Sequence, residues 1–253
     1  MEKSLISVVM PAYNCLNTLR QSVESVMGQS DPNWELLLLD DCSQDGTGEL
    51  IRELASLDSR IRAVTNDKNR GVGYTRNRGV SLARGEWIAF LDSDDLWTSD
   101  KLEKQRSLAE GHPEADLFFT GSGFMDRDGR RLNYVLHVPE KIDRRRLLKQ
   151  NLISCSSVLL RRDAALSQPF PQQRRIHEDF AVWLRLLEGG KLAWAVDEPL
   201  LIYRLSPQSK SGNKLAAARM NWNTYRTVGL TIPASMYYMG WYTVKGLLKY
   251  SKL

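Results

Sequence analysis

Residues 87–95 read WIAFLDSDD, a short apolar run that ends in a cluster of acids. The run from Trp87 to Leu91 has the length and residue types of a strand that is buried on both faces of a sheet. Asp92, Asp94 and Asp95 follow it directly, so their carboxylates repel one another. We therefore expect positive charge beside the end of this strand.

Three earlier apolar runs are also followed by polar loops. SLISVVM, WELLLLD and IRAVTN are strand-like, and MPAYN, DDCSQDGT and NRGVGYTRNRG come at their ends. Helical patterns lie between these runs. The expected helices carry Leu16, Leu19, Val23 and Val26 on one face, run through GELIRELASL with Thr47 as N-cap, and extend from Thr75 to Ala83.

This alternation of strands and helices predicts an α/β fold. We expect an open, mostly parallel, Rossmann-like sheet with helices on both faces. In such sheets ligands bind outside the carboxyl ends of the strands. The four polar loops are therefore expected to meet at one crevice.

The second half of the chain is less regular. ADLFFTG and SCSSVLLRR are strand-like, Asp128-Gly129 indicates a hairpin, and HEDFAVWLRLLEGG is an amphipathic helix that stops at Gly189. No linker or repeat separates the halves. We expect one catalytic domain over residues 1–212, with a nucleotide-binding half (1–98) and an acceptor-binding half (99–212), followed by a basic, aromatic helical extension (213–253).

The acid cluster has two interpretations from its residues alone. Asp92 and Asp94, one residue apart on a turn, can bind a hard divalent cation such as Mg²⁺ or Mn²⁺ and leave coordination sites for phosphate oxygens. Alternatively, these acids only turn the chain and cap the helix after Trp97.

The motifs together resemble the family 2 glycosyltransferases, which have the GT-A fold. SVVMPAYN, LLLLDDCSQDGT, GVGYTRNRG, WIAFLDSDDLW and HEDFAVWLRL occur in the order of that family, over residues 4–210. The resemblance implies a nucleotide-diphosphate-sugar transferase of the kind that builds bacterial surface polysaccharides.

The resemblance also implies roles for the residues of the donor site. Asp41 would accept a hydrogen bond from the imide N–H of uracil or thymine, since a carboxylate accepts but does not donate; a plain loop turn at Asp40-Asp41 is the alternative. Arg76 would lie near the nucleotide phosphates. Pro11, Ala12 and Tyr13 would border the nucleoside, Ser93 would be the middle residue of the DxD motif, Asp94 would bind the metal, and Asp92 would contact the ribose, the sugar or the metal.

The family pattern places the catalytic base at the start of the later helix. Asp179 would deprotonate the acceptor hydroxyl with Glu178 beside it, whereas the alternative is that both are ordinary acids of a helix N-terminus. Ser206 stands where many relatives have a metal-site histidine. Ser154, Ser156 and Ser157 are expected on a strand near the acceptor cleft, although simple sheet packing explains them as well.

Composition adds the expected environment. The chain has 253 residues, three widely spaced cysteines and no long uninterrupted apolar stretch, which favours a cytoplasmic protein. The net charge of +5 is uneven, because residues 199–253 contain no acid. The aromatic and basic tail suits peripheral contact with the inner face of an anionic membrane; a partner helix or dimer contact is the alternative, and nucleic acid is not expected.

The resulting prediction is a metal-dependent, inverting glycosyltransferase of the hexosyl- or N-acetylhexosaminyltransferase class. It would move a sugar from UDP, or a related nucleotide diphosphate, to a hydroxyl of a glycan or polyprenyl-linked glycan in O-antigen, capsule or exopolysaccharide synthesis. A non-catalytic nucleotide-sugar-binding or membrane-docking module is the alternative. A nucleotidyltransferase is disfavoured, because MPAYNCLN is not a glycine-rich, basic triphosphate loop.

Overall fold

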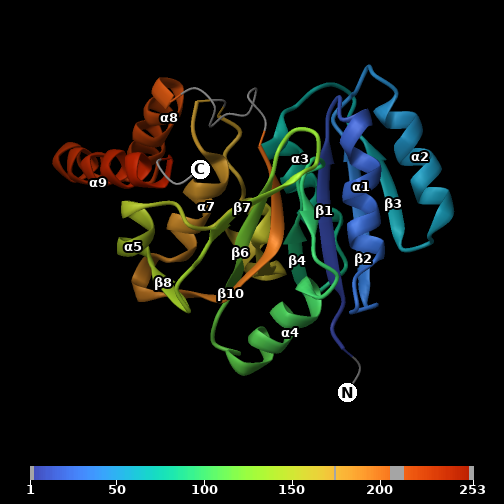
Figure 1. Cartoon of the computed structure of the whole chain (residues 1–253), viewed down its shortest axis with the longest axis horizontal. Helices are drawn as coiled ribbons and strands as arrows, with labels where there is room; N and C mark the ends of the chain where they lie inside the picture. Colours follow the sequence, from blue (N-terminus) through green and yellow to red (C-terminus); the bar gives the residue numbers. More distant parts are fainter. Residues whose placement is uncertain (1–2, 174, 206–213, 251–253) are drawn as a thin grey trace.

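The computed structural model describes residues 3–173, 175–205 and 214–250. One sheet crosses the molecule in the order β3-β2-β1-β4-β9-β6-β10-β5, with β7 paired to β6 and β8 paired to β10 (Figure 1). Its strands are β1 (Ile6–Ala12), β2 (Trp34–Asp40), β3 (Ile61–Thr65), β4 (Trp87–Phe90), β5 (Leu96–Trp97), β6 (Leu117–Met125), β7 (Arg131–Leu136), β8 (Lys141–Asp143), β9 (Leu159–Arg161) and β10 (Leu192–Arg204).

Helices follow most of the strands. They are α1 (Leu16–Met27), α2 (Thr47–Leu57), α3 (Val72–Leu82), α4 (Lys101–Gly111), α5 (Arg144–Lys149), α6 (Arg162–Ser167), α7 (Glu178–Leu186), α8 (Lys214–Thr227) and α9 (Ile232–Tyr250), with short 3₁₀ helices η1 (Cys155–Ser157) and η2 (Glu188–Gly190).

Most of the long strands of the sheet run in one direction. β1 is parallel to β2 and β4, and β2 is parallel to β3. β9 lies antiparallel between β4 and β6, and β10 is parallel to β6, so β6 and β10 share the direction of the first four strands. The predicted open, mostly parallel α/β sheet is confirmed.

Two hydrophobic cores cover the two faces of the sheet. Val8 of β1 and Leu36 of β2 belong to the core under α1, α2 and α4, whereas the next residues, Val9 and Leu37, belong to the core under α3, α6 and α7. This alternation follows from the two-residue period of a strand. Because both faces are covered, the strands are apolar throughout, as expected for a parallel sheet.

Two local predictions about helix starts are wrong. The N-cap of α2 is Gly46, at φ 90°, and Thr47 is the first helical residue. The Thr47 hydroxyl is occupied by Asp45 and by the backbone N–H of Cys15, which joins the loops after β1 and β2. α3 begins at Val72 rather than Thr75, because Gly71 at φ 86° supplies the preceding turn.

The predicted strand through SCSSVLLRR is also largely wrong. Residues Cys155–Ser157 form the 3₁₀ helix η1, and only Leu159–Arg161 form a strand. The backbone oxygens of Ser156 and Ser157 accept hydrogen bonds from the side chains of Trp97 and Gln105, respectively. These side-chain partners replace the ladder bonds of a strand. The hairpin at Asp128-Gly129, in contrast, is present between β6 and β7.

The C-terminal helices pack on the domain. Tyr225 of α8 is fully buried, and its hydroxyl donates to the backbone oxygen of Leu148. α9 packs against α8 and α5, at the end of the molecule opposite α2 (Figure 1). Among the described residues, no helix is both long and apolar enough to cross a bilayer. The proposed boundary between residues 212 and 213 stays a prediction.

Gly79 sets the distance between α3 and the sheet. A Cβ atom at this position would lie 2.4 Å from Cγ1 of Val9 on β1 and 3.2 Å from a methyl of Leu39 on β2. α3 therefore lies close enough to the sheet for only a hydrogen to fit. The helix carries Arg76 one turn earlier, so this close approach also fixes the position of that side chain.

We expect Gly79→Ala to destabilise the protein. The added methyl overlaps a β-branched side chain that has little rotamer freedom, and overpacking of this kind costs about 1 to 3 kcal/mol. Chemical denaturation would measure the loss. Gly111→Ala, where a Cβ would meet nothing within 4 Å, is the control. Equal stability of the two variants would contradict the close contact.

Candidate active site

The polar loops after β1, β2 and β4 lie side by side. These three strands are neighbours in the order β2-β1-β4. The N–H of Asp41 donates to the backbone oxygen of Ala12 at 2.8 Å, and the N–H of Leu91 donates to that of Val9 at 3.2 Å. Pro11 and Ala12 are buried in β1, while Tyr13 is 48% exposed at the start of the loop.

Asp41 organises the start of α3. Its buried carboxylate accepts hydrogen bonds from the backbone N–H of Arg70 (2.9 Å) and Gly71 (2.7 Å), and from Nδ2 of Asn66 (2.7 Å). A carboxylate has about four acceptor positions, so one remains for a further donor. Asp41 thus connects the loop after β2 with the loop that leads into α3.

Arg76 joins the acidic loop to the start of α7. Its Nη2 donates to Oδ1 of Asp92 at 2.6 Å, and its Nη1 donates to Oε1 of Glu178 at 3.2 Å. The Arg76 side chain is only 4% exposed. Burial works against its charge, but Asp92, Glu178 and Asp179 hold its pKa well above the ordinary value. The expected positive charge beside the end of β4 is thus present as a guanidinium. A bound metal cation, the source that the acidic motif indicates, stays a prediction.

The acids next to Asp92 have raised pKa values. Burial, followed by the negative charge of Asp92, raises the pKa of Asp94 to about 6, while Arg204 opposes the shift. Burial, followed by the charges of Asp94 and Asp92, raises the pKa of Asp95 well above its usual range. The N-cap of α4 is Asp100, so these acids do not cap the helix that follows them.

Arg204, at the end of β10, fixes the acidic loop from the other side. Its Nε donates to the backbone oxygen of Asp94 at 2.8 Å, and its backbone N–H donates to Oδ1 of Asp95 at 3.0 Å. The same guanidinium donates to the backbone oxygen of Arg127 and to Oε1 of Gln21. Arg204 was not predicted from the sequence, although its position at the end of the last long strand was the available signal.

Ser156 of η1 supports the same loop. Ser156 is fully buried, and its Oγ accepts a hydrogen bond from the backbone N–H of Asp92 at 3.1 Å. Ser157 is also buried, with its hydroxyl donating to the backbone oxygen of Ser154. Ser93 lies half-buried within hydrogen-bonding reach of the Cys15 thiol. Of these serines, Ser156 therefore holds the backbone of the acidic loop.

Asp179 lies in the first turn of α7, beside Glu178. Its Oδ1 accepts from the backbone N–H of Phe180 at 2.8 Å. Burial and the neighbouring Glu178 raise the pKa of Asp179, and the charges of Arg76 and His177 oppose this shift. Asp92, Arg76, Glu178 and Asp179 therefore form one electrostatic group, although they come from three separate parts of the chain.

Asp92 and Asp94 are suitable ligands for a hard divalent cation. Carboxylate oxygens are the ligands that Mg²⁺ and Mn²⁺ prefer, and a cation would relieve the repulsion that raises the pKa of Asp94. The described residues contain no group of three or more His, Cys, Asp and Glu side chains arranged around a metal. Oxygens from a bound diphosphate would have to complete such a site. Ser206 lies outside the described residues.

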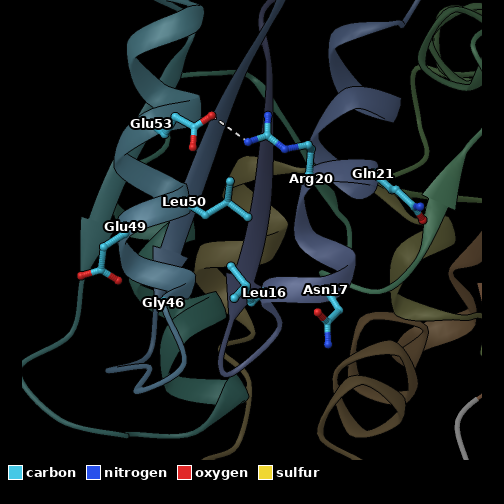
Figure 2. A pocket seen from close by; sticks show the side chains of 8 residues that line it. All are labelled: Leu16, Asn17, Arg20, Gln21, Gly46, Glu49, Leu50 and Glu53. Atoms are coloured by element: carbon cyan, nitrogen blue, oxygen red, sulfur yellow. Dashed lines mark hydrogen bonds and ion pairs between the residues drawn. The ribbon is translucent and has the colours of Figure 1, made fainter.

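A separate groove lies between α1 and α2. It has a volume of about 540 Å³, and Leu16 and Leu50 lie between the two helices (Figure 2). Its charges are neutralised locally, because Arg20 pairs with Glu53 and Glu49 pairs with Arg52. None of the carboxylates around Arg76 lines it. We therefore take the acidic loop, and not this groove, as the candidate site.

Comparison with known protein sequences identifies the family of the chain. The family described as "Glycosyl transferase family 2" matches residues 7–168. The chain is 38% identical to the putative teichuronic acid biosynthesis glycosyltransferase TuaG of Bacillus subtilis, over 89% of each chain. It is 34% identical to the UDP-Glc:alpha-D-GlcNAc-diphosphoundecaprenol beta-1,3-glucosyltransferase WfgD of Escherichia coli, over 99% of this chain and 97% of that one.

Solved structures show the same fold. S. aureus TarS in complex with UDP-GlcNAc superposes with a TM-score of 0.73 at 17% identity, over 93% of this chain and 70% of that chain. The mannosyltransferase PcManGT of Pyrobaculum calidifontis, in complex with GDP-Man and Mn²⁺, gives a TM-score of 0.71 at 15% identity, over 95% of this chain and 69% of that chain. The predicted GT-A fold is confirmed.

We expect Arg76→Ala to destabilise the protein strongly. The substitution leaves Asp92 and Glu178 without their shared cation, and breaking a buried ion pair typically costs about 3 to 5 kcal/mol. Arg70→Ala is the matched control, because Arg70 is exposed and pairs with the exposed Asp67. Urea denaturation at neutral pH would compare the two. A similar small effect in both variants would contradict the central role of Arg76.

Proposed function

Because this chain belongs to glycosyl transferase family 2, we propose that it transfers a sugar from a UDP-sugar, with inversion, to a hydroxyl of a lipid-linked glycan. The chain is a glycosyltransferase by its family. The donor, the acceptor, the stereochemistry and the need for a metal are the parts that we propose.

The observation that carries this proposal is the double ion pair of Arg76. It holds the acidic loop after β4 and the start of α7 beside one guanidinium. An inverting transferase site needs both the acidic loop and the start of α7, because the diphosphate leaving group and the attacking hydroxyl lie on opposite sides of the anomeric carbon. Asp92 and Asp94 are then available for the donor, and Asp179 for the acceptor.

The loops after β1 and β2 would bind the nucleoside. Asp41 retains one acceptor position beyond its three internal donors, which suits the imide N–H of uracil. Pro11, Ala12 and the exposed Tyr13 border this region and would contact the base. UDP is the proposed nucleotide because a carboxylate at this position favours a ring with an N–H. The E. coli relative is named for UDP-Glc.

Asp94 and Asp92 would hold a Mn²⁺ or Mg²⁺ ion together with the diphosphate. When bound, such an ion would stabilise the negative charge that develops on the leaving diphosphate. Ser93, between the two acids, and Arg204 would support this site without binding the ion. Arg204 keeps the backbone of Asp94 in place. Arg76 would orient Asp92 rather than bind phosphate directly, because its guanidinium already contacts two carboxylates.

Asp179 would act as the base that removes the proton of the acceptor hydroxyl. The raised pKa of Asp179 makes it a better proton acceptor than an ordinary aspartate. The positive charge of Arg76 opposes this shift, and Asp179 needs that charge to remain ionised. Glu178 is engaged by Arg76 and would position this turn. The proton moves to Oδ of Asp179 as the acceptor oxygen bonds to the sugar.

A lipid-linked acceptor would place the enzyme at the inner face of the cytoplasmic membrane. The name of the E. coli relative specifies a diphosphoundecaprenol acceptor, and the Bacillus subtilis relative is named for teichuronic acid biosynthesis. The C-terminal helices of this chain contain aromatic and basic residues without acids, which agrees with peripheral attachment.

We expect Asp94→Asn to abolish metal-dependent UDP binding. The amide keeps the shape of the side chain but lacks the formal charge that holds a hard cation. Titration calorimetry with UDP, with and without Mn²⁺, would measure the effect. Asp128→Asn, in the exposed β6–β7 turn, is the control. If Mn²⁺ strengthens UDP binding equally in both variants, the metal assignment is wrong.

We expect Asp179→Asn to retain donor binding and lose turnover. An amide cannot accept the proton at neutral pH, so the rate should fall about a hundredfold to ten-thousandfold, or roughly 3 to 5 kcal/mol of barrier. Calorimetry with the UDP-sugar and assays of product formation would be run together. Near wild-type turnover would reject Asp179 as the base.

An assay of UDP release by the wild-type protein would distinguish an enzyme from a non-catalytic binding module. A panel of nucleotide sugars is incubated with the protein, with and without lipid-linked glycan acceptors. Steady UDP release that depends on an acceptor is expected. Binding of a nucleotide sugar without turnover on any member of the acceptor panel would favour the binding module instead.

A further inference from the structure

α9 has an exposed apolar face. Ile232, Met236, Tyr237 and Val244 are 53–64% exposed, and Trp241 at the edge of this face is 38% exposed. The opposite face of the helix packs on the domain: Ser235 is fully buried, and Tyr238 contacts the ring of Tyr225. Exposed apolar side chains that gather on one helix face mark a binding surface.

α5 borders this face with positive charge. Its sequence is RRRLLK, and α5 packs directly against α9 (Figure 1). Nζ of Lys149 lies 5.1 Å from the centroid of the Trp241 ring. Arg145 and Arg146 are exposed, and neither forms an ion pair within the described residues. Arg144, in contrast, points inward to the backbone oxygens of Leu184 and Val228.

The charged residues of α8 and α9 are all basic. No acid occurs in residues 199–253, whereas the rest of the chain contains acids throughout. The acid of the α5 segment, Asp143, is occupied as the N-cap of α5, where it accepts from the backbone N–H of Arg146. Basic side chains beside exposed aromatic and aliphatic ones suit a layer of anionic headgroups over hydrocarbon.

We propose that the exposed face of α9 and the basic residues of α5 form one docking surface for an anionic lipid bilayer. α9 would lie along the membrane surface with its apolar side chains among the acyl chains, and Arg145, Arg146 and Lys149 would meet lipid phosphates. This deepens the proposed function, because a lipid-linked acceptor requires the site to work beside a membrane. It also assigns a role to α5, which no active-site motif explains.

The contribution of α5 distinguishes this surface from a simple tail anchor. An amphipathic helix alone binds through its apolar area, and this term does not depend on lipid charge. Basic residues near the surface each strengthen binding to anionic lipid by several-fold, and salt weakens their effect. Because α9 also carries lysines, lipid charge and salt report on the basic residues of both helices. Substitution of Arg145 and Arg146 isolates the contribution of α5, and apolar substitutions report on α9.

The test is co-sedimentation of the full-length protein with vesicles. Phosphatidylcholine vesicles are compared with vesicles that also contain phosphatidylglycerol, at low and high salt. Arg145→Glu/Arg146→Glu removes the charge of α5, and Met236→Asn/Val244→Asn removes apolar contacts of α9. Arg52→Glu/Arg84→Glu is the matched control, since both arginines are exposed outside this surface.

We expect wild type to bind the anionic vesicles in preference, and more weakly at high salt. The α5 variant should lose at least about tenfold in partitioning to anionic vesicles. The α9 variant should bind both kinds of vesicle more weakly, and the control should behave as wild type. UDP binding should be unchanged in all variants, which shows that they are folded and separates this test from the proposed chemistry.

Three results would overturn the proposal. Equal binding to both vesicle types would remove the role of lipid charge. An unchanged α5 variant would restrict the surface to α9 alone. Absence of vesicle binding by wild type, together with a dimer in solution that the α9 variant dissociates, would identify the face as a contact between two copies of the chain.

Discussion

The double ion pair of Arg76 is the interaction on which the site depends. Its guanidinium is buried between Asp92, after β4, and Glu178, at the start of α7. A buried arginine is stable only when carboxylates compensate its desolvation, and the crowded acids need a cation for the same reason. The guanidinium could not keep its charge in this position without the two carboxylates, and the carboxylates could not keep theirs without the guanidinium.

A second arginine completes the electrostatics of the acidic loop. Arg204, at the end of β10, donates hydrogen bonds to the backbone oxygen of Asp94 and to the carboxylate of Asp95. Arg76 thus approaches the loop from α3 and Arg204 from β10. Ser156 accepts a hydrogen bond from the backbone N–H of Asp92. The loop is held by its backbone, which leaves the side chains of Asp92 and Asp94 partly exposed.

The sequence predicts the parts of this site that depend on local pattern. Apolar strands followed by polar loops, together with the order of the motifs, indicate the sheet, its functional edge and the acidic loop. The pairing of Arg76 was not predicted, because it depends on how α7 returns to the sheet about a hundred residues later. Arg204 was missed for the same reason. The serines of η1 looked like a strand, since nothing local shows that Trp97 and Gln105 take their backbone oxygens.

The position of Arg76 couples the two halves of the proposed reaction. Its positive charge opposes the raised pKa of Asp179, and its strongest hydrogen-bonded partner is Asp92. In the proposed site, a cation bound at Asp92 would compete with Arg76 for that carboxylate, and the guanidinium would then interact more strongly with Glu178 and Asp179. A closer contact with Arg76 would favour the ionised form of Asp179, which is the form that accepts a proton. In the proposed reaction, the donor site and the base would therefore be coupled electrostatically through one guanidinium.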